Sequence, residues 1–182
     1  MRRPPVLRTG PSGVLLGALL LAGCAAEPAP TRTTAPTGLP VPPDAQEATV
    51  VRLVDGDTVQ LRGRGVGPLP AGPTRVRLLL IDTPEVHAEQ ECFGEQASDR
   101  AAQLLPAGSR VRVQADRDPQ DRFGRALLHL WNTDGVNVGE ALVREGFAEV
   151  LLVRPNERYL GAFEQAEREA RDAGRGLWSA CG

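Results

Sequence analysis

Residues 48–62 carry the clearest indication of the fold, with the sequence Ala-Thr-Val-Val-Arg-Leu-Val-Asp-Gly-Asp-Thr-Val-Gln-Leu-Arg. Two β-rich runs, 48–55 and 58–62, flank Asp55-Gly56, and the second run alternates strictly between polar and apolar residues. Asp-Gly between two such runs is a strong hairpin signal, because glycine adopts the left-handed backbone that tight hairpin turns require. The stretch therefore predicts two antiparallel strands joined by a short turn.

Three further strands follow the hairpin along the chain. They are expected at 74–81, 110–115 and 125–131, where β-branched and apolar residues accumulate. The first of these runs ends in consecutive large apolar residues, which is typical of a strand buried on both faces.

Three helices are indicated by apolar residues at helical spacing. The first is expected around 97–105. The second is expected to begin at Asn137, three residues before Glu140 in a capping-box arrangement, and to end at Gly146. The third carries a stripe of aromatic residues and alanines and is expected to end at Gly174.

The resulting order of elements is β-β-β-α-β-β-α-α. Five short strands with a helix between the third and the fourth is the order of an OB-type barrel, whose outer face commonly carries oligonucleotides. We therefore expect an α+β fold, a five-stranded OB-fold barrel with three helices.

The composition excludes several classes of protein. The 182 residues are 41% apolar and 24% charged, which suits one soluble domain with attachments and excludes collagens, coiled coils and multi-span membrane proteins. All 21 basic residues are arginine, so a Schiff-base lysine and a P-loop lysine are both impossible. Two histidines and three cysteines leave little material for a zinc site, and any bound metal should have oxygen ligands.

The N-terminal region predicts export and attachment to a membrane. Residues 1–23 contain three arginines, an apolar run at 14–21 and Leu-Ala-Gly directly before Cys24, which is the pattern of a signal peptide. This ending resembles the bacterial lipobox, in which the cysteine carries the lipid of the mature protein; the alternative is ordinary secretion with an incidental cysteine. Residues 24–45 are rich in proline and threonine and predict an extended tether, so that the folded domain is expected at 46–182.

The mature chain is acidic. Removal of the first 23 residues takes away three of the 21 arginines and leaves 18 against 23 acidic residues, a net charge of −5. An overall electrostatic attraction to nucleic acid is therefore not expected, and phosphate recognition would need a local arginine cluster.

The two remaining cysteines, Cys92 and Cys181, are a candidate disulfide in an oxidising compartment. Closing a loop of about 90 residues would stabilise the fold by roughly 4 to 5 kcal/mol in the chain-entropy model. Two free buried thiols are the alternative.

Acidic and basic residues at the ends of predicted strands are the candidate functional groups. Asp55 and Asp57 lie around the tight turn, where a hard cation could be held or the pair simply forms the turn. Asp82 lies at the end of the apolar strand and Glu85 just past a proline, where a carboxylate has a functional task or a strand simply ends in solvent. Arg77 and Arg125 border buried strands and offer planar forks suited to phosphate oxygens, although isolated arginines are more often ion-pair partners. Arg77 and Asp82 are five residues apart, so a regular strand would place them on opposite faces.

Five motifs, taken in order, resemble the staphylococcal nuclease (thermonuclease) family, and they span most of the chain from residue 49 to residue 179. They are Asp-Gly-Asp-Thr at 55–58, Arg-Leu-Leu-Leu-Ile-Asp-Thr-Pro-Glu at 77–85, Asp-Arg-Phe-Gly-Arg at 121–125, Leu-Val-Arg-Glu-Gly at 142–146 after Asn137, and Gly-Leu-Trp-Ser at 176–179.

The resemblance implies a metal site. Asp57 and Asp82 would supply carboxylate ligands to Ca²⁺, and the main-chain carbonyl of Thr83 would be a further ligand. Asp55 would belong to the outer shell of the site. No other cofactor is implied.

The resemblance also implies catalytic roles. Glu85 would activate or orient the attacking water as general base. Arg77 and Arg125 would clamp the phosphate and stabilise the additional charge of the transition state, and the family's barrel would bring Arg77 and Asp82 to one site.

One residue and one segment depart from the family's best-known member. Phe123 replaces a tyrosine, which removes a hydroxyl contact to phosphate but keeps a ring for stacking. Leu151 and Leu152, within the run 150–153, stand where that member has aromatic residues in its base pocket. Together with the acidic net charge, these changes predict a weaker or less discriminating nuclease rather than an inactive one.

The expected function is metal-dependent hydrolysis of phosphodiester bonds in DNA and RNA, outside the cytoplasm, by a monomer anchored to the membrane through lipid on Cys24. The main alternative is a noncatalytic OB-fold lipoprotein that binds nucleic acid or a protein partner. A barrel that serves only as a spacer is a third reading.

Overall fold

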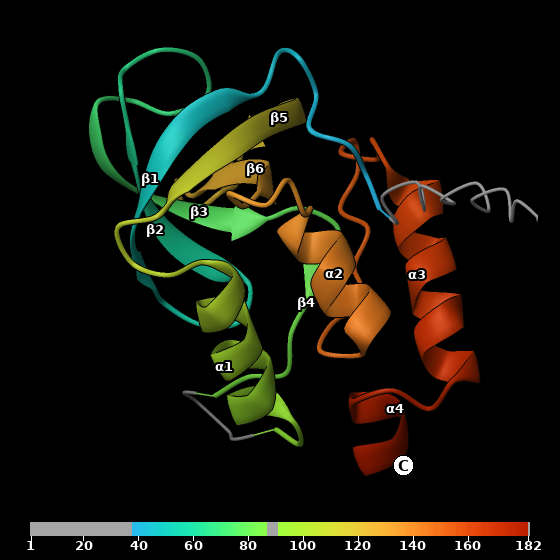
Figure 1. Cartoon of the computed structure of the whole chain (residues 1–182). Helices are drawn as coiled ribbons and strands as arrows, with labels where there is room; N and C mark the ends of the chain where they lie inside the picture. Colours follow the sequence, from blue (N-terminus) through green and yellow to red (C-terminus); the bar gives the residue numbers. More distant parts are fainter. Residues whose placement is uncertain (1–37, 87–90, 182) are drawn as a thin grey trace, which may run out of the picture. The chain divides into compact units, whose positions relative to one another are not determined.

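The predicted hairpin is the first strand pair of a closed barrel (Figure 1). The structure is a computed structural model that describes residues 38–86 and 91–181. Strand β1, Gln46–Leu53, pairs antiparallel with β2, Thr58–Gly63. In the turn between them, Oδ1 of Asp55 accepts the backbone N–H of Asp57 at 3.2 Å and of Thr58 at 2.7 Å. The Asp55 carboxylate therefore shapes the turn from which Asp57 projects.

The other barrel strands are β3, Gly72–Leu78, β5, Arg110–Gln120, and β6, Ala126–Trp131. Their order around the barrel is β1-β2-β3-β6-β5, and pairing of β1 with β5 closes it. β3 and β6 run parallel, whereas the other adjacent pairs are antiparallel. The expected α+β fold with a five-stranded OB-type barrel and three helices is confirmed.

The three expected helices are α1, Gly94–Leu104, α2, Val138–Glu145, and α3, Leu160–Asp172. The side chain of Asn137 accepts the N–H of Glu140 at 3.0 Å, and Gly146 ends α2 with φ 79°, so both predicted helix boundaries are confirmed. α2 and α3 pack side by side (Figure 1). A further short helix, α4, Leu177–Ala180, was not predicted.

The apolar run expected as one strand at 74–81 is broken, which corrects that prediction. β3 ends at Leu78, Leu80 adopts a left-handed backbone with φ 66°, and a two-residue strand, β4, Ile81–Asp82, pairs with β7, Glu149–Val150. All four residues from Leu78 to Ile81 are at most 5% exposed. A continuous apolar run shows no periodicity that would reveal the bend.

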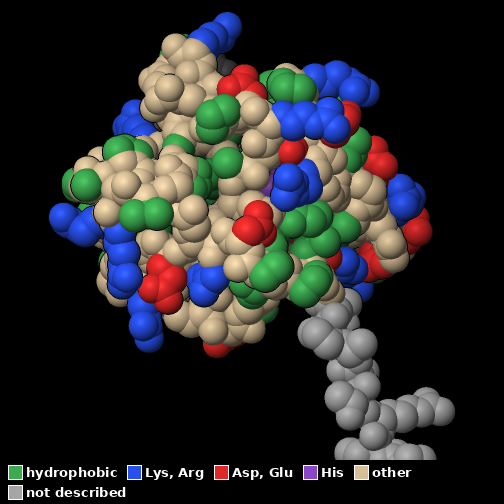
Figure 2. All heavy atoms as spheres, turned by 90° about the horizontal axis from the view of Figure 1, so that it is seen from above, with side chains coloured by type: hydrophobic (Ala, Val, Ile, Leu, Met, Phe, Trp, Pro, Cys, Tyr) green, Lys and Arg blue, Asp and Glu red, His purple; other side chains and the backbone are tan. Residues whose placement is uncertain are grey.

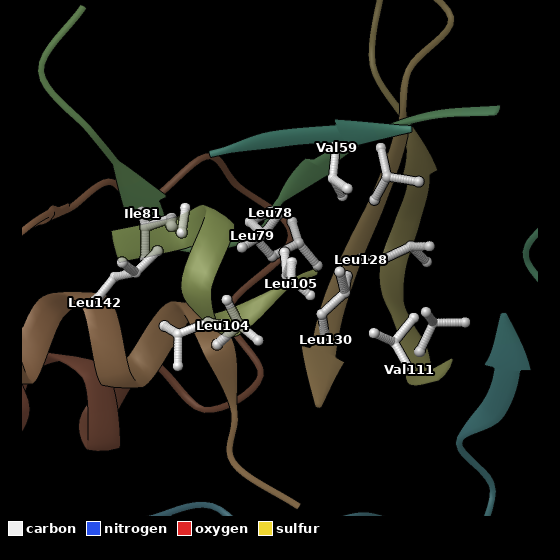
Figure 3. Close-up of a cluster of buried hydrophobic side chains, with 14 of the residues drawn as sticks. Val59, Leu78, Leu79, Ile81, Leu104, Leu105, Val111, Leu128, Leu130 and Leu142 are labelled. Atoms are coloured by element: carbon white, nitrogen blue, oxygen red, sulfur yellow. The ribbon is translucent and has the colours of Figure 1, made fainter. Parts of the chain in front are cut away.

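The core fills the barrel and continues under the helices. In Figure 3, side chains next to the end of α1 lie in one cluster with those of β6 and of the bend after β3. Leu105, Leu128 and Leu130 are each at most 2% exposed, and burial of one leucine contributes about 1.5–3 kcal/mol to stability. The rim of the barrel, which carries the candidate site, is thus supported by a tightly packed interior.

The end of the expected tether packs against the domain. The carbonyl of Leu39 accepts the indole N–H of Trp131 at 2.9 Å, and the backbone N–H of Leu39 donates to Oε2 of Glu140 at 3.1 Å. Ala45 is 4% exposed, and Oδ1 of Asp44 accepts a hydrogen bond from Gln114. Residues 38–45 are therefore not an extended solvated segment, and the packed unit starts before residue 46.

The expected signal peptide, Cys24 and most of the tether lie within residues 1–37, outside the described residues. Among helices of the described part, none is both long and apolar enough to cross a membrane.

A disulfide joins Cys92 to Cys181 with a Cα–Cα distance of 5.8 Å, which confirms the predicted pair over the alternative of two free thiols.

A buried histidine makes stability dependent on pH. His129 is 2% exposed, packs edge-on against Tyr159 and near Phe163, and neither ring nitrogen has a hydrogen-bond partner among the described residues. Burial lowers the pKa of His129 to about 4, and Asp116 only partly offsets this. Because the unfolded chain binds this proton more readily than the folded one, stability present above pH 6.5 is lost as pH falls toward 4.

We expect the free energy of unfolding of the wild type to fall as the pH is lowered from 7 to 4.5. His129 alone should contribute at most about 3 kcal/mol to this decrease. Urea denaturation of the wild type and of His129→Phe at several pH values measures it. The difference between the two proteins should change across this window. Parallel pH profiles would show that His129 is not the group responsible.

Candidate active site

Two carboxylates from different parts of the chain converge on one guanidinium group. Nη2 of Arg77 lies 2.9 Å from Oδ2 of Asp57 and 2.7 Å from Oδ1 of Asp82. Asp57 comes from the β1–β2 turn, Arg77 from β3 and Asp82 from β4. The structure therefore brings together three of the predicted site residues.

The bend after β3 makes this contact possible. Nη1 of Arg77 donates to the carbonyls of Leu78 at 3.0 Å and Ile81 at 2.7 Å. The chain therefore wraps around the guanidinium group instead of continuing as a strand. The opposite-face arrangement expected for a regular strand does not apply, because Arg77 and Asp82 lie in different strands.

Asp57 is held in a fixed, largely dry position. Thr58 donates its hydroxyl to Oδ1 at 3.0 Å, and the N–H of Thr83 donates to Oδ2 at 3.2 Å. Gly56 is required beside it, because a Cβ atom at this position would lie 2.6 Å from Oγ1 of Thr83. Burial raises the pKa of Asp57 to about 6, with Arg77 opposing the rise and Asp55 adding to it.

The donor set fits a hard cation. Carboxylate and carbonyl oxygens are the ligands that Ca²⁺ prefers, and a desolvated carboxylate such as Asp57 gains most from a neighbouring positive charge. The guanidinium of Arg77 already lies against both carboxylates. A metal held by Asp57 and Asp82 would therefore have to displace this group in part. No group of three or more His, Cys, Asp or Glu residues that could hold a metal occurs in the described ranges, so water and the Thr83 carbonyl would complete the coordination.

Arg125 is oriented by a carboxylate of its own. Its Nε donates to Oδ2 of Asp121 at 2.6 Å, and the N–H groups of Phe123 and Arg125 both donate to Oδ1 at 2.9 Å. Burial acts to raise the pKa of Asp121, but these hydrogen bonds outweigh it and lower the pKa. Asp121 therefore stays ionised and fixes the fork of Arg125 at the start of β6.

Arg77 and Arg125 line one cavity of about 440 Å³. Its apolar wall includes Leu127, Leu151 and Val153, and Phe123 stands at the cavity with 69% of its surface exposed. In the run 150–153, where the family's best-known member has aromatic residues of its base pocket, Leu151 and Val153 line the cavity and Leu152 does not. The cavity combines an apolar surface with four arginines, since Arg122 and Arg154 line it beside Arg77 and Arg125.

The guanidinium of Arg122 lies 4.7 Å from the centre of the Phe123 ring, and that of Arg125 lies 5.7 Å from it. The face of the molecule shown in Figure 2 has basic and acidic side chains interspersed and no broad basic patch. On this face, positive charge is not gathered over a broad area, whereas Arg122 and Arg125 place it beside the Phe123 ring.

Glu85 lies on the loop that follows Thr83-Pro84. It is not among the residues that line the cavity with Arg77 and Arg125, and its backbone N–H donates to Oε2 of Glu91 at 2.9 Å. The structure thus leaves Glu85 exposed and outside the cavity of the two arginines, three residues after Asp82 in the chain.

The sequence pattern did not reveal Asp121 or Glu91 as members of the site. Asp121 lies four residues before Arg125 in the quoted motif 121–125, and this spacing could have indicated the pair. Glu91 is six residues from Glu85 in a loop with no regular pattern, so its contact is visible only in the structure.

An OB-type barrel with Arg77 and Arg125 on one cavity, and with two carboxylates paired on Arg77, defines a class of proteins suited to anionic, phosphate-bearing ligands. Residues 75–180 match the family described as "Staphylococcal nuclease homologue". The chain belongs to this family, as the motifs predicted.

The relatives found include the "SPbeta prophage-derived endonuclease YokF" of Bacillus subtilis (strain 168), 36% identical over 138 residues that make up 73% of this chain and 44% of the relative. "Endonuclease YncB" of the same organism is 35% identical, covering 74% of this chain and 62% of the relative. A "Thermonuclease" of Staphylococcus intermedius is 35% identical over 133 residues, 71% of this chain and 74% of the relative. The chain therefore spans about half of the length of the two Bacillus relatives.

We expect Ca²⁺ to raise the melting temperature at pH 8 and to do so much less at pH 5, because protonated Asp57 is a poor ligand. Differential scanning fluorimetry with Ca²⁺ and with chelator measures this shift. Asp57→Asn should abolish it, whereas Asp134→Asn, which changes an exposed loop carboxylate, should keep it. A calcium shift of equal size in Asp57→Asn would place the ion elsewhere.

Proposed function

We propose that this protein is a nuclease that hydrolyses phosphodiester bonds in both DNA and RNA with the help of a calcium ion. The observation that carries the proposal is the presence of Arg77 and Arg125 on one cavity, with the Asp57 and Asp82 carboxylates at the first of them. Membership in a family of nucleases and the names of the relatives support the reaction class.

Hydrolysis of a phosphodiester requires a positioned water molecule, fixed alignment of the phosphate and neutralisation of charge at the phosphoryl oxygens. Two guanidinium groups provide the last two requirements. Each is already oriented by carboxylates, Arg77 by Asp57 and Asp82 and Arg125 by Asp121, so little rotamer freedom is lost when a phosphate binds.

Asp57, Asp82 and the main-chain carbonyl of Thr83 would hold the calcium ion. The bound ion would supply positive charge to the phosphoryl oxygen. Glu85, two residues after Thr83, would accept the proton of the attacking water as general base. Histidine is not needed, because a carboxylate can perform this role.

The apolar wall of the cavity suits a nucleobase. Phe123 offers an exposed ring for stacking, whereas Leu151 and Val153 give only dispersion contacts without directional hydrogen bonds. These contacts fit any base, which supports a base-nonspecific enzyme.

Lipid attachment at Cys24 and action outside the cytoplasm belong to the proposal as well. They rest on the lipobox-like sequence before Cys24 and on the Cys92–Cys181 disulfide, which suits an oxidising compartment. Labelling of the full chain in a bacterial host with a clickable fatty acid, with Cys24→Ser as the control, would test the anchor.

Arg77→Ala and Arg125→Ala should each lower kcat on denatured DNA by about 100- to 1,000-fold, the usual loss for one preorganised charge donor. Release of acid-soluble nucleotides, with calcium and with chelator, measures the effect. Arg64→Ala is the matched control, because Arg64 is exposed and forms its ion pair with Glu47, away from the cavity residues. Undiminished hydrolysis in both site variants, or binding without any hydrolysis by the wild type, would contradict the proposal.

Phe123→Ala should raise KM for single-stranded DNA by about tenfold with little change in kcat, since stacking on one ring contributes about 1–3 kcal/mol. Steady-state kinetics with a fluorogenic oligonucleotide measures both constants. Val66→Ala alters another exposed apolar residue and serves as control. An unchanged KM would mean that the base does not reach Phe123.

A further inference from the structure

Two acidic residues close the loop that carries Glu85. The backbone N–H of Glu85 donates to Oε2 of Glu91 at 2.9 Å, and the N–H of Glu91 donates to the carbonyl of Glu85 at 3.0 Å. We refer to this reciprocal pair as the Glu85–Glu91 clasp. It binds both polar groups of the Glu85 main chain, and the acceptor of the first bond is a carboxylate, which makes that bond charge-assisted.

The clasp is attached to the C-terminal end of the described chain. Cys92, the residue after Glu91, forms the disulfide with Cys181, directly after α4. α4 is itself fixed, because the N–H of Leu177 donates to the carbonyl of Gly146 at 2.9 Å and the Trp178 ring lies 4.0 Å from the guanidinium of Arg171. The disulfide therefore ties Glu91 to an element that contacts the residue ending α2, Gly146, and a residue of α3, Arg171.

The start of α1 presses on the same backbone. A Cβ atom on Gly94 would lie 2.6 Å from the carbonyl oxygen of Glu85 and 3.1 Å from that of Pro84. Phe93 precedes it in a left-handed conformation, with its ring 5.3 Å from that of Phe147. Only glycine leaves room for this approach.

Glu85 is therefore restrained directly by Glu91 and by the close approach of Gly94, and indirectly by the Cys92–Cys181 disulfide beside Glu91. We propose that Glu91 and the Cys92–Cys181 disulfide are positioning residues for Glu85, holding its backbone so that its carboxylate faces the attacking water; this rests on the proposed nuclease function. A general base must be held within a fraction of an ångström of its working position, and displacement by about 1 Å costs up to about 100-fold in rate. Loop residues need such additional fixation because few of their backbone groups are paired.

The proposal separates the role of the Glu91 charge from that of its hydrogen bond. Glu91 also lines a small cavity with Asp82 and Thr83, so its charge alone could influence a cation there. Glu91→Gln removes the charge but keeps a side-chain oxygen that accepts the N–H of Glu85. Glu91→Ala removes both.

The test compares kcat and KM on single-stranded DNA for wild type, Glu91→Ala, Glu91→Gln and the Cys92→Ser/Cys181→Ser double variant, well below the lowest melting temperature. Asp99→Ala, an exposed carboxylate on α1, is the control. We expect a 10- to 100-fold loss of kcat with unchanged KM in Glu91→Ala and in the double variant, and near-complete rescue in Glu91→Gln. Reduction of the wild-type disulfide should reproduce the loss, and reoxidation should reverse it.

Amide hydrogen exchange at Glu85 gives a readout that does not depend on activity. Exchange should be at least tenfold faster in Glu91→Ala and in the double variant than in the wild type and in Glu91→Gln. If the wild type hydrolyses DNA and kcat is unchanged in all variants, the positioning role is wrong and the nuclease function stands. If the wild type does not hydrolyse DNA, both the nuclease function and the positioning role are wrong. The exchange rates then show only whether the Glu85–Glu91 clasp forms.

Discussion

The site depends on one interaction, the contact of the Arg77 guanidinium with two carboxylates and two carbonyls. Through this group the β1–β2 turn, the end of β3 and the start of β4 are held together, and its side chain is only 13% exposed. A permanently charged, planar donor is needed, since a lysine could not reach four acceptors in fixed directions. The chain therefore bends at Leu79-Leu80 around a charge, although the surrounding residues are apolar.

Asp57 and Arg77 form a largely buried ion pair next to the packed core of the barrel. Burial makes ionisation of Asp57 unfavourable and raises its pKa; Arg77 and the hydrogen bonds from Thr58 and Thr83 offset part of this cost within the site, and the packed barrel and the disulfide supply the rest of the stability. The same desolvation makes Asp57 a strong attractor for a second cation. A site that is destabilised when empty of metal gains more when a metal binds.

Much of the fold could be predicted because local signals agreed with it. Asp55-Gly56 indicated the hairpin, and Asn137 and Gly146 indicated the limits of α2. The bend at Leu80 could not be predicted from the sequence, because a run of fully buried leucines has no hydrophobic periodicity. The contact of Leu39 with Trp131 could not be predicted either, because the two residues are 92 positions apart. For the site, the chemically competent residue types could be chosen from their motifs, but their convergence on Arg77 and the contact of Glu91 with Glu85 depend on the tertiary structure.

A double-mutant cycle on Arg77 and Arg125 tests the central claim most directly. kcat/KM for a phosphodiester substrate would be measured in the wild type, Arg77→Ala, Arg125→Ala and the double variant. If both groups act on one phosphate, their effects are not additive, and the coupling exceeds about 0.5 kcal/mol. Strictly additive effects would show that the two arginines work at separate places and would contradict a single phosphate site in the cavity.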